Sequence, residues 1–387
     1  MTLPVSPTDL PALKQLRQSL HQYPELSGAE FKTAERIVSY LQAYNPSKVY
    51  TGLGGTGVAA VFDGKVSEGP VVLFRAELDA LPIAETNTFS YTSVQDGTGH
   101  KCGHDGHMAI LAGLGSLLHT QQLQTGKVIL LFQPAEETGA GAWAVLQDAR
   151  FEKELRPDYV FALHNLPGFP LHQVVLRKGV FAAASTGMVI TLTGKSSHAA
   201  EPENGLNPGL AMAEILLSFD KLIADKTQFE DLTLLTVIHA RLGEVAFGTN
   251  PGHGTVMATL RSYLPADLQK LKIRAEQVVA QTALRHGLQF GITFVEEFPA
   301  TVNHPEAVGL VQEAGLALGL SVIEAETPFR WSEDFGHLTH RYPGAFFGLG
   351  SGVSQPQLHH ADFDFPDELL PTGAVLFYQI AASILNS

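Results

Sequence analysis

Short runs of apolar residues recur along this chain and are separated by segments with helical spacing. The runs lie at residues 71–74, 128–132, 159–163 and 345–349. Each run is brief and uniformly apolar, as expected of a strand that is buried on both faces. Amphipathic helical patterns, for example at 108–119 and 141–148, lie between the runs. This alternation predicts an α/β fold with a mostly parallel sheet that is flanked by helices on both faces.

A different pattern occupies the middle of the chain. Three segments there mix Thr with Val, Ile and Leu, which is a strand-like composition, at residues 188–193, 234–239 and 254–261. A long amphipathic helical pattern follows at 266–286. This order predicts a small α+β domain with an antiparallel sheet, inserted at 180–297. Residues 1–179 and 298–387 then form one larger domain.

Length and composition agree with two globular domains. The chain has 387 residues, more than the roughly 250–300 at which a single core usually stops growing. Hydrophobic residues make up 45% and charged residues 17% of the chain, which is typical of a globular protein and not of a disordered one. The net charge of −14 at pH 7 argues against a nucleic-acid or anionic-membrane partner.

Cysteine usage and the first residues bear on the cellular compartment. Cys102 is the single cysteine, so the chain forms no internal disulfide. The first residues lack the basic start and apolar run of a signal peptide. No stretch reaches the roughly 18 apolar residues that would span a membrane. We therefore expect a soluble, cytoplasmic protein with no membrane partner.

Polar residues that can bind a metal follow each of the four apolar runs. In chain order these residues are Glu77, Asp79, Glu136, Glu137, His164 and His359. In open α/β sheets, ligands bind outside the carboxyl ends of the strands. We therefore expect these side chains to meet at one edge of the sheet.

Cys102 and His104 precede a predicted helix and are further candidates. They are two residues apart, so on an extended loop they face the same side. Thiolate and imidazole suit zinc, and also manganese, cobalt or nickel in mixed sites. Asp105 and His107 could orient such ligands. The alternative is an ordinary helix start, in which Asp105 is the cap and the thiol is simply buried.

Each of the other candidates also has an ordinary explanation. Glu136 and Glu137 could be a solvated helix N-terminus, His164 a core histidine with its hydrogen bonds satisfied, and His359 part of a solvated turn. Adjacent carboxylates at the end of a buried strand are nevertheless costly without a cation. Alternation along an extended segment would let one of them bind a metal while the other faces a reacting water. Taken together, the candidates at one sheet edge favour a metal centre.

The inserted domain contributes His198, Asn250 and Arg261. His198 follows a predicted strand, where a solvent-facing hairpin tip would explain the polar sequence. Asn250 and Arg261 are equally ordinary when taken alone. The planar guanidinium of an arginine is nonetheless the natural partner for a carboxylate.

Together, these motifs resemble a known family. They are RAELDALP (75–82), GHKCGHDGH (99–107), QPAEETGAGA (133–142), HNLP (164–167), GKSSHAAEP (194–202), SEDFG (332–336) and LHHADFDF (358–365). Their order and spacing resemble the two-metal peptidase and aminoacylase family that includes carboxypeptidase G. The branch most similar hydrolyses hippurate, N-acetyl-amino acids and indole-acetyl-amino acids. The resemblance spans nearly the whole chain.

The resemblance implies a catalytic domain with two divalent metal ions and an inserted lid that often mediates dimerisation. Cys102 would bridge the two ions. Glu137 and His359 would complete one metal site, and His104 and His164 would complete the other.

The resemblance also implies roles around the metals. Glu136 would be the general base and Asp79 an orienting residue. His198 would stabilise the oxyanion, and it could do so in the site of a partner subunit. Asn250 and Arg261 would help to hold the carboxylate of the substrate.

Two departures from the family pattern bear on specificity. Glu77 stands where this branch usually has Asp, which lengthens a side chain beside the metals. The stretch FGTNPGHG (247–254) is shorter than the usual lid sequence, which affects both the role of Asn250 and the acyl specificity.

The predicted function is metal-dependent hydrolysis of the amide bond of N-acyl amino acids by a homodimer. The expected ions are zinc or manganese, with cobalt or nickel as further candidates. Dipeptidase or carboxypeptidase activity is the alternative within the family. Two other classes stay open: a cysteine hydrolase with Cys102 as the nucleophile, and a non-catalytic protein that binds a metal or ligand in the same cleft.

Overall fold

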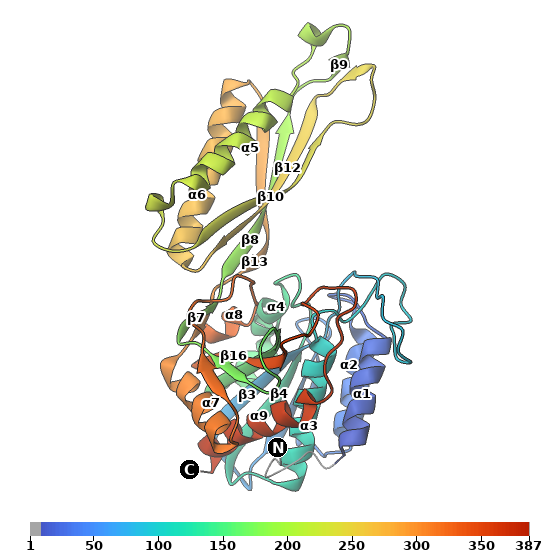
Figure 1. Cartoon of the computed structure of the whole chain (residues 1–387), viewed down its shortest axis with the longest axis vertical. Coiled ribbons are helices and arrows are strands. Elements are labelled where there is room, and N and C mark those ends of the chain that lie inside the picture. Colours follow the sequence, from blue (N-terminus) through green and yellow to red (C-terminus); the bar gives the residue numbers. More distant parts are fainter. Residues whose placement is uncertain (1–8, 387) are drawn as a thin grey trace. The chain divides into compact units, whose positions relative to one another are not determined.

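Two compact units make up the chain in the computed structural model, which describes residues 9–386 (Figure 1). Unit 1 contains the chain up to Phe181, the segment Thr301–Thr327 and the chain from Asp334 onward. Unit 2 contains Ala182–Ala300 and Pro328–Glu333. The short second segment joins unit 2 through backbone hydrogen bonds, a feature for which the sequence pattern gives no sign.

An eight-stranded sheet forms the centre of unit 1, in the order β1-β2-β4-β3-β5-β16-β6-β15. Its strands are β1 (Lys48–Leu53), β2 (Gly57–Asp63), β3 (Val66–Glu77), β4 (Thr125–Gln133), β5 (Tyr159–Pro167), β6 (Val174–Leu176), β15 (Val322–Glu324) and β16 (Gly344–Gly352). The four central strands β4, β3, β5 and β16 are parallel and contain the four apolar runs. The β1–β2 hairpin and β6 add antiparallel pairings on either side. The predicted, mostly parallel sheet is confirmed.

Helices cover both faces of this sheet (Figure 1). They are α1 (Leu10–Gln22), α2 (Phe31–Gln42), α3 (His104–Thr120), α4 (Gly141–Gln147), the π-helical turn η1 (Phe151–Leu155), α7 (Pro305–Ala317), α8 (Gly336–Thr339) and α9 (Leu369–Leu385). Two further strands, β7 (Gly179–Ala182) and β14 (Thr301–Asn303), pair in a small sheet of their own. Among residues 9–386, none of the helices combines the length and the apolar character needed to cross a membrane.

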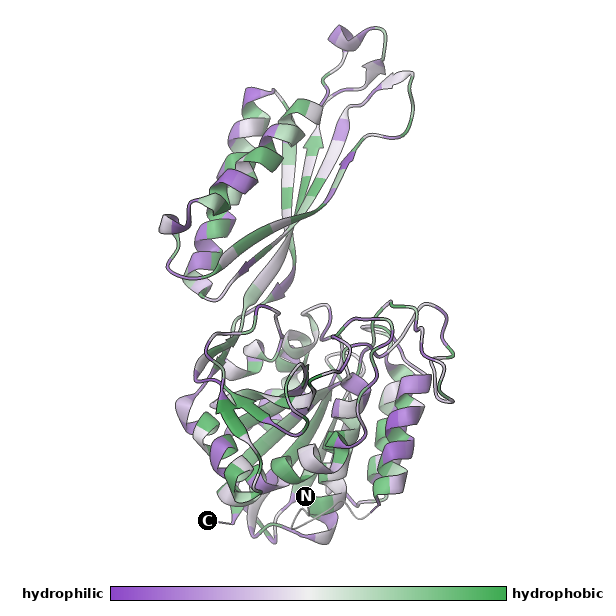
Figure 2. Ribbon diagram, in the orientation of Figure 1, coloured by the Kyte–Doolittle hydropathy of each residue, from purple (hydrophilic) through white to green (hydrophobic). Residues whose placement is uncertain are grey.

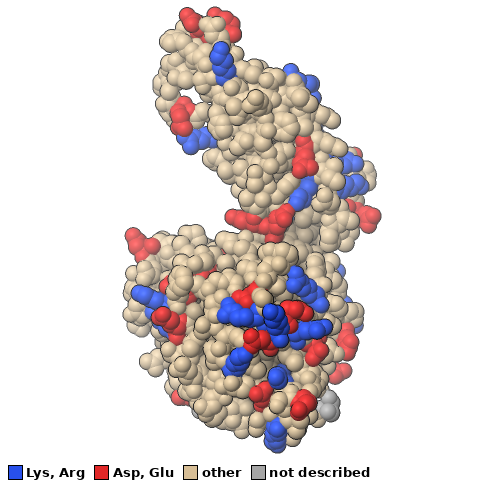
Figure 3. Space-filling model, turned by 180° about the vertical axis from the view of Figure 1, so that it is seen from behind, with Lys and Arg blue, Asp and Glu red and all other residues tan. Residues whose placement is uncertain are grey.

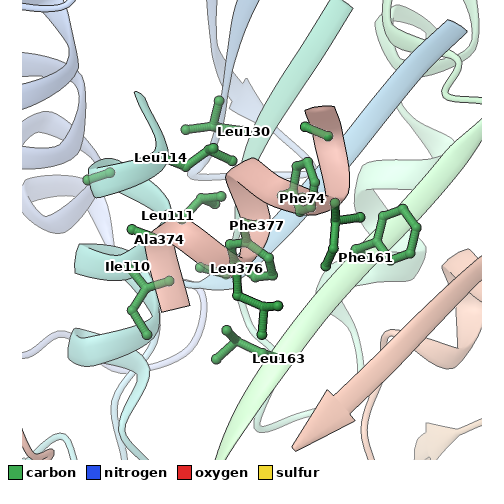
Figure 4. Packing of buried hydrophobic residues seen from close by; sticks show 14 of the residues in the cluster. Phe74, Ile110, Leu111, Leu114, Leu130, Phe161, Leu163, Ala374, Leu376 and Phe377 are labelled. Carbon is green, nitrogen blue, oxygen red and sulfur yellow. The ribbon is translucent and has the colours of Figure 1, made fainter. Parts of the chain in front are cut away.

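Helices α3 and α9 pack together over one face of the sheet (Figure 4). Leu111 and Leu114 of α3 lie close to Phe377 of α9, and all three side chains are buried. The Phe377 ring lies 4.8 Å, centroid to centroid, from that of Phe74 on β3. Burying each such side chain stabilises the fold by about 1.5–3 kcal/mol. This packing fixes α3, whose first residue is His104.

Helix α1 has the amphipathic pattern that its sequence predicts. Leu13, Leu16 and Leu20 are buried in the same core as α3. In Figure 2 the helix carries both hydrophilic and hydrophobic colours, whereas the central strands are mostly hydrophobic. The spacing of these leucines places them on one face of the helix.

Unit 2 is built on a four-stranded antiparallel sheet, in the order β10-β12-β8-β13. Its strands and helices are β8 (Ala184–Thr193), α5 (Gly209–Ala224), β10 (Thr233–Leu242), β12 (His253–Ser262), α6 (Pro265–Arg285) and β13 (Gln289–Phe298). Burial alternates along β8 and β12, because α5 and α6 cover only one face of the sheet. Shorter elements are β9 (Ser197–His198), β11 (Thr249–Asn250) and the 3₁₀ turns η2 (Pro202–Asn204) and η3 (Lys226–Gln228). The predicted α+β unit with an antiparallel sheet is confirmed.

Both signs of charge are interspersed on the face of unit 1 seen in Figure 3. Exposed ion pairs such as Arg156 with Glu152, at 3.7 Å, are part of the unit 1 surface. Pairs of this kind stabilise a fold by only about 0–1 kcal/mol. Charged groups that matter more for the structure are buried, and they lie around the candidate site.

Substitution of Gly106 tests how closely the start of α3 is packed, and substitution of Gly309 on α7 is its control. A Cβ atom at Gly106 would lie 2.2–2.4 Å from ring atoms of Phe365, whereas a Cβ at Gly309 on α7 has nothing within 4 Å. We expect Gly106→Ala to lower the free energy of unfolding by about 1–3 kcal/mol, and Gly309→Ala to raise it by up to about 1 kcal/mol. Urea denaturation of the metal-free proteins measures both changes. Equal shifts in the two variants would contradict the close contact at Gly106.

Candidate metal centre

The candidate metal ligands gather at the carboxyl edge of the parallel strands of unit 1. In chain order they are Cys102 and His104 at the start of α3, Glu137 after β4, His164 on β5 and His359 after β16. Parallel strands direct their carboxyl ends to one edge of a sheet, which brings together residues up to 257 positions apart in sequence (359 − 102). Asp79 and Glu136 follow β3 and β4 at the same edge.

Cys102 belongs to two groups of potential ligands. Its Sγ atom lies near His104 and His164 in one group, and near Glu137 and His359 in the other. Within each group the ligand atoms lie within 4.8 Å of one another. An ion bound at about 2.0–2.3 Å would hold tetrahedral ligands about 3.5 Å apart. The geometry therefore suits two ions that share the sulfur of Cys102.

Individual distances agree with this arrangement. Cys102 Sγ lies 3.3 Å from Nε2 of His164. Oε1 of Glu137 lies 3.8 Å from Nε2 of His104 and 3.9 Å from Nε2 of His359. Nε2 of His104 is buried and has no hydrogen-bond partner among the residues that the structure describes. A cation would satisfy this nitrogen, which is costly to bury unpaired.

Backbone conformation shapes the loops that carry these ligands. Gly103 has a φ of +100°, and a Cβ there would lie 2.3 Å from Oδ1 of Asn165, so the turn between Cys102 and His104 requires glycine. Ala135 and His359 also have positive φ, at 49° and 66°. Such conformations cost about 1–3 kcal/mol in residues other than glycine and cluster at functional sites.

Burial changes the protonation of the candidate ligands. Burial and the nearby Glu137 carboxylate hold the pKa of the Cys102 thiol well above its usual value. Burial, together with His107, holds the pKa of His164 well below its usual value, so this imidazole is neutral. A divalent cation would favour the thiolate and bind the neutral imidazole. The donor set of thiolate, imidazole and carboxylate therefore fits a pair of divalent metal ions.

Asp79 connects two of the ligand-bearing segments. Its Oδ2 accepts hydrogen bonds from the Ser27 hydroxyl at 2.7 Å and from the Glu137 backbone N–H at 3.0 Å. The backbone carbonyl of Asp79 lies 2.9 Å from Nδ1 of His104. This contact fixes the ring so that Nε2 points toward the other ligands.

Glu77 is fully buried and is held by two other charged or polar side chains. Arg75 forms an ion pair with Oε1, and Nδ1 of His107 lies 2.8 Å from Oε2. Burial alone would raise the pKa of Glu77, but Arg75 and then His107 and His104 hold it well below its usual value. The longer side chain of Glu77 is thus accommodated by a buried ion pair.

Arg75 extends this network toward Glu136. Its Nη2 atom donates to Oδ1 of Asp334 at 2.6 Å, and its Nε donates to Oε1 of Gln133 at 2.9 Å. The backbone N–H of Asp334 lies 3.4 Å from Oε1 of Glu136. A buried network therefore orients the carboxylate that lies beside the metal ligands.

A second buried network surrounds His21, on the other side of the segment that carries Cys102 and His104. His21 contacts Asp105 through Nδ1 at 2.8 Å and Glu85 through Nε2 at 2.9 Å. Burial alone would lower the pKa of His21, but these two carboxylates raise it to about 9. Burial would raise the pKa of Glu85, but His21 and Lys101 lower it to about 2. His21, Glu85 and Asp105 are therefore charged at neutral pH.

The three candidates in unit 2 have partners within that unit. His198 on β9 is exposed, and its Nδ1 accepts from the Ala200 N–H at 3.1 Å. Asn250, on the paired strand β11, donates to the Ser197 hydroxyl at 3.0 Å. Arg261 on β12 donates to the carbonyl of Arg330 at 2.8 Å. His198 and Asn250 thus come from two strands that pair with each other, and Arg261 contacts the short segment 328–333.

Sequence reasoning missed the charged residues that support the ligands. Arg75, His21, Glu85 and Lys101 were not among the predicted site residues. Arg75 directly follows the apolar run 71–74. A charge at that position of a buried strand indicates that the fold supplies an oppositely charged or hydrogen-bonding partner. His21 has no comparable signal, because its partners lie 64 and 84 residues away.

The family model for peptidases of the M20/M25/M40 families matches residues 73–383 of this chain. The chain belongs to the M20 peptidase family. The resemblance inferred from the motifs is thereby confirmed. Similar proteins include the N-acetyl-L-cysteine deacetylase of Bacillus subtilis. It is 32% identical over 387 residues, and the match covers 99% of this chain and 91% of the relative. The Arabidopsis thaliana IAA-amino acid hydrolase ILR1-like 5 is 33% identical over 390 residues, and the match covers 96% of this chain and 86% of the relative.

A solved M20 structure has the same fold. The YXEP protein of Bacillus subtilis, described as a dinuclear metal-binding peptidase, superposes with a TM-score of 0.81. It is 26% identical in sequence, and the match covers 97% of this chain and 98% of that one. This M20 chain is accordingly a metal-dependent amidohydrolase with a centre for two divalent ions.

The His21 network gives the stability of the protein a defined pH dependence. The pKa of His21 is higher in the folded chain, about 9, than its ordinary value of about 6.5. Protonated His21 therefore stabilises the folded chain fully below pH 6.5, and this stabilisation is lost as the pH rises through 9. The unfolding free energy of wild type minus that of His21→Gln measures this contribution. We expect this difference to be larger at pH 6 than at pH 10 by on the order of 3 kcal/mol.

Urea denaturation of both proteins across this pH range measures the difference. His340→Gln, at an exposed position, is the matched control and should give a curve parallel to wild type. A constant gap between wild type and His21→Gln would show that His21 does not bind its extra proton in the folded state.

Proposed function

We propose that this enzyme hydrolyses the amide bond of N-acyl amino acids, with Glu136 as the general base. The observation that carries the proposal is the position of Glu136 beside the ligand groups that share Cys102. Its Oε2 atom lies 4.0 Å from Nε2 of His104, and its Oε1 is held by the backbone of Asp334. The relatives named for N-acetyl-L-cysteine and for IAA-amino acids support an N-acyl amino acid as the substrate class.

Cys102 would bridge the two ions in this proposal. His104 and His164 would hold one ion, and Glu137 and His359 the other, an assignment supported by two groups of potential ligands that include Cys102. Asp79 would orient His104 and the Glu137 loop through its hydrogen bonds. Zinc or manganese suits a thiolate, imidazole and carboxylate donor set, and cobalt or nickel could also bind.

The chemistry then requires one proton carrier. Divalent ions held by these ligands would supply a positive charge that lowers the pKa of a bound water toward neutrality. Glu136 accepts the proton of the attacking water as general base and returns it to the nitrogen of the leaving amino acid. The network of Arg75, Gln133 and Asp334 keeps its carboxylate in place during both transfers.

The candidates of unit 2 would act on the substrate. We propose that His198 stabilises the oxyanion that develops on the amide carbonyl. Asn250 and Arg261 would hold the carboxylate of the amino acid, for which a guanidinium is well suited. These roles would give unit 2 control over the choice of substrate.

A homodimer is the assembly that we propose. Strand β10 is at the edge of the sheet in unit 2, and Val237, Ile238 and Leu242 on it are exposed. An edge strand with exposed apolar side chains is a template for pairing with another chain. A second copy of unit 2 would cover it.

Metal removal tests the proposed reaction. We expect hydrolysis of N-acetyl amino acids or hippurate to disappear after chelation and to return with Zn²⁺, Mn²⁺ or Co²⁺. A panel that also contains dipeptides separates this activity from that of a dipeptidase. Activity that survives chelation but is lost on alkylation with iodoacetamide would instead indicate a cysteine hydrolase using Cys102. Bound metal with no hydrolysis of any substrate would indicate a binding protein.

Glu136→Gln separates catalysis from metal binding. The amide cannot accept the proton of the water, so we expect the rate to fall by more than about a hundredfold, with metal content unchanged by elemental analysis. Glu313→Gln, at an exposed position on α7, is the matched control and should keep full activity. Near wild-type turnover in Glu136→Gln would rule out this residue as the base.

A further inference from the structure

Lys101 binds both ends of the segment that carries His359. We propose that Lys101 is a positioning residue for the metal ligand His359, an inference that rests on the proposed two-metal function. Its backbone carbonyl accepts a hydrogen bond from the N–H of His359 at 2.7 Å. Its Nζ atom donates to the carbonyl of Phe363 at 2.9 Å. One residue thus ties the segment 359–363 to the segment that carries Cys102 and His104.

The side chain of Lys101 is fully buried, which is rare for a lysine. Its charge is balanced by an ion pair with Oε1 of Glu85, which is itself almost fully buried. Asn87 strengthens the same junction, because its Nδ2 lies 3.0 Å from Oε1 of Glu85 and 3.2 Å from the Phe363 carbonyl. The Phe363 carbonyl therefore receives hydrogen bonds from two side chains that both bind Glu85.

His359 needs such support more than the other candidate ligands do. Residues 353–368, all of which the structure describes, form turns without a helix or strand. The side chain of His359 is 52% exposed, so packing contributes little to its position. Its backbone has a φ of 66°, a conformation that non-glycine residues rarely adopt. Hydrogen bonds from outside the segment therefore hold the backbone at His359 in place.

The two ligand groups should respond differently to the loss of Lys101. His359 belongs to the group with Cys102 and Glu137, whereas His104 and His164 lie on α3 and β5. If Lys101 positions His359, its loss weakens the site that contains His359 and spares the other. A purely structural role would affect both sites together.

Lys101→Met is the variant that tests this inference, because methionine fills similar space without the ammonium group. We expect titration of metal-free wild type with MnCl₂ to show two ions per chain. In Lys101→Met the first ion should bind as in wild type, and the second about 10- to 100-fold more weakly, the usual effect of changing a residue behind a metal ligand. At limiting Mn²⁺ kcat should fall while KM stays unchanged, and excess Mn²⁺ should restore kcat.

Two further variants keep the test decisive. Asn87→Ala removes one of the two hydrogen bonds to the Phe363 carbonyl and should weaken the same ion by a smaller factor, which matters if Lys101→Met fails to fold. Val311→Ala removes buried methyl groups on α7. It controls for a general loss of stability and should leave both binding steps as in wild type.

The outcomes distinguish this inference from the function on which it rests. Wild type that binds fewer than two ions would overturn the proposed two-metal function, and the inference with it. Two ions in wild type, with either no change or equal weakening of both steps in Lys101→Met and Asn87→Ala, would overturn the positioning role alone.

Discussion

Anionic groups crowd the carboxyl edge of the parallel sheet in unit 1, and the structure around the site depends on how their charge is balanced. Glu77, Asp79 and Asp334 are fully buried there, with Glu136 nearly so. Removing a carboxylate from water costs several kcal/mol unless a cation or several hydrogen bonds compensate for it. Arg75 pairs with Glu77 and Asp334, and hydrogen bonds satisfy Oδ2 of Asp79. Two divalent cations would balance the remaining ligands, so metal binding and the stability of this edge are linked.

The need to balance buried charges also explains why residues from distant parts of unit 1 support the site. Arg17 on α1 binds Asp364 and Asp367 near the C-terminal end, at 2.7 and 2.8 Å. Lys101, in the loop before α3, pairs with Glu85 and also donates to the Phe363 carbonyl in the segment that carries His359. Arg17 and Lys101 therefore have partners from distant parts of the chain. Such partners form only once the sheet has assembled, so the ligand geometry is a property of the completed fold.

Sequence patterns could predict the features that are encoded locally. Four apolar runs identified the four parallel strands, and the residues that follow them include most of the candidate metal ligands, because a strand end and its candidate ligand are neighbours in sequence. The partners of the supporting charges could not be predicted in this way. Arg75 and Asp334 are 259 residues apart, and no local pattern indicates that they meet. Helix α9 was missed for a different reason: it is buried on most sides, so it lacks the polar face by which a helix is recognised.

All of the candidate metal ligands belong to unit 1, whereas the residues proposed to bind the substrate belong to unit 2. This division has a chemical consequence. The candidate metal centre, the proposed base Glu136 and both buried networks lie within one unit, apart from the residues proposed to bind the substrate. If Asn250 binds the substrate as proposed, changes in the stretch around it would alter specificity while the reaction stays the same. The names of the relatives fit this view, because one acts on N-acetyl-L-cysteine and another on IAA-amino acids.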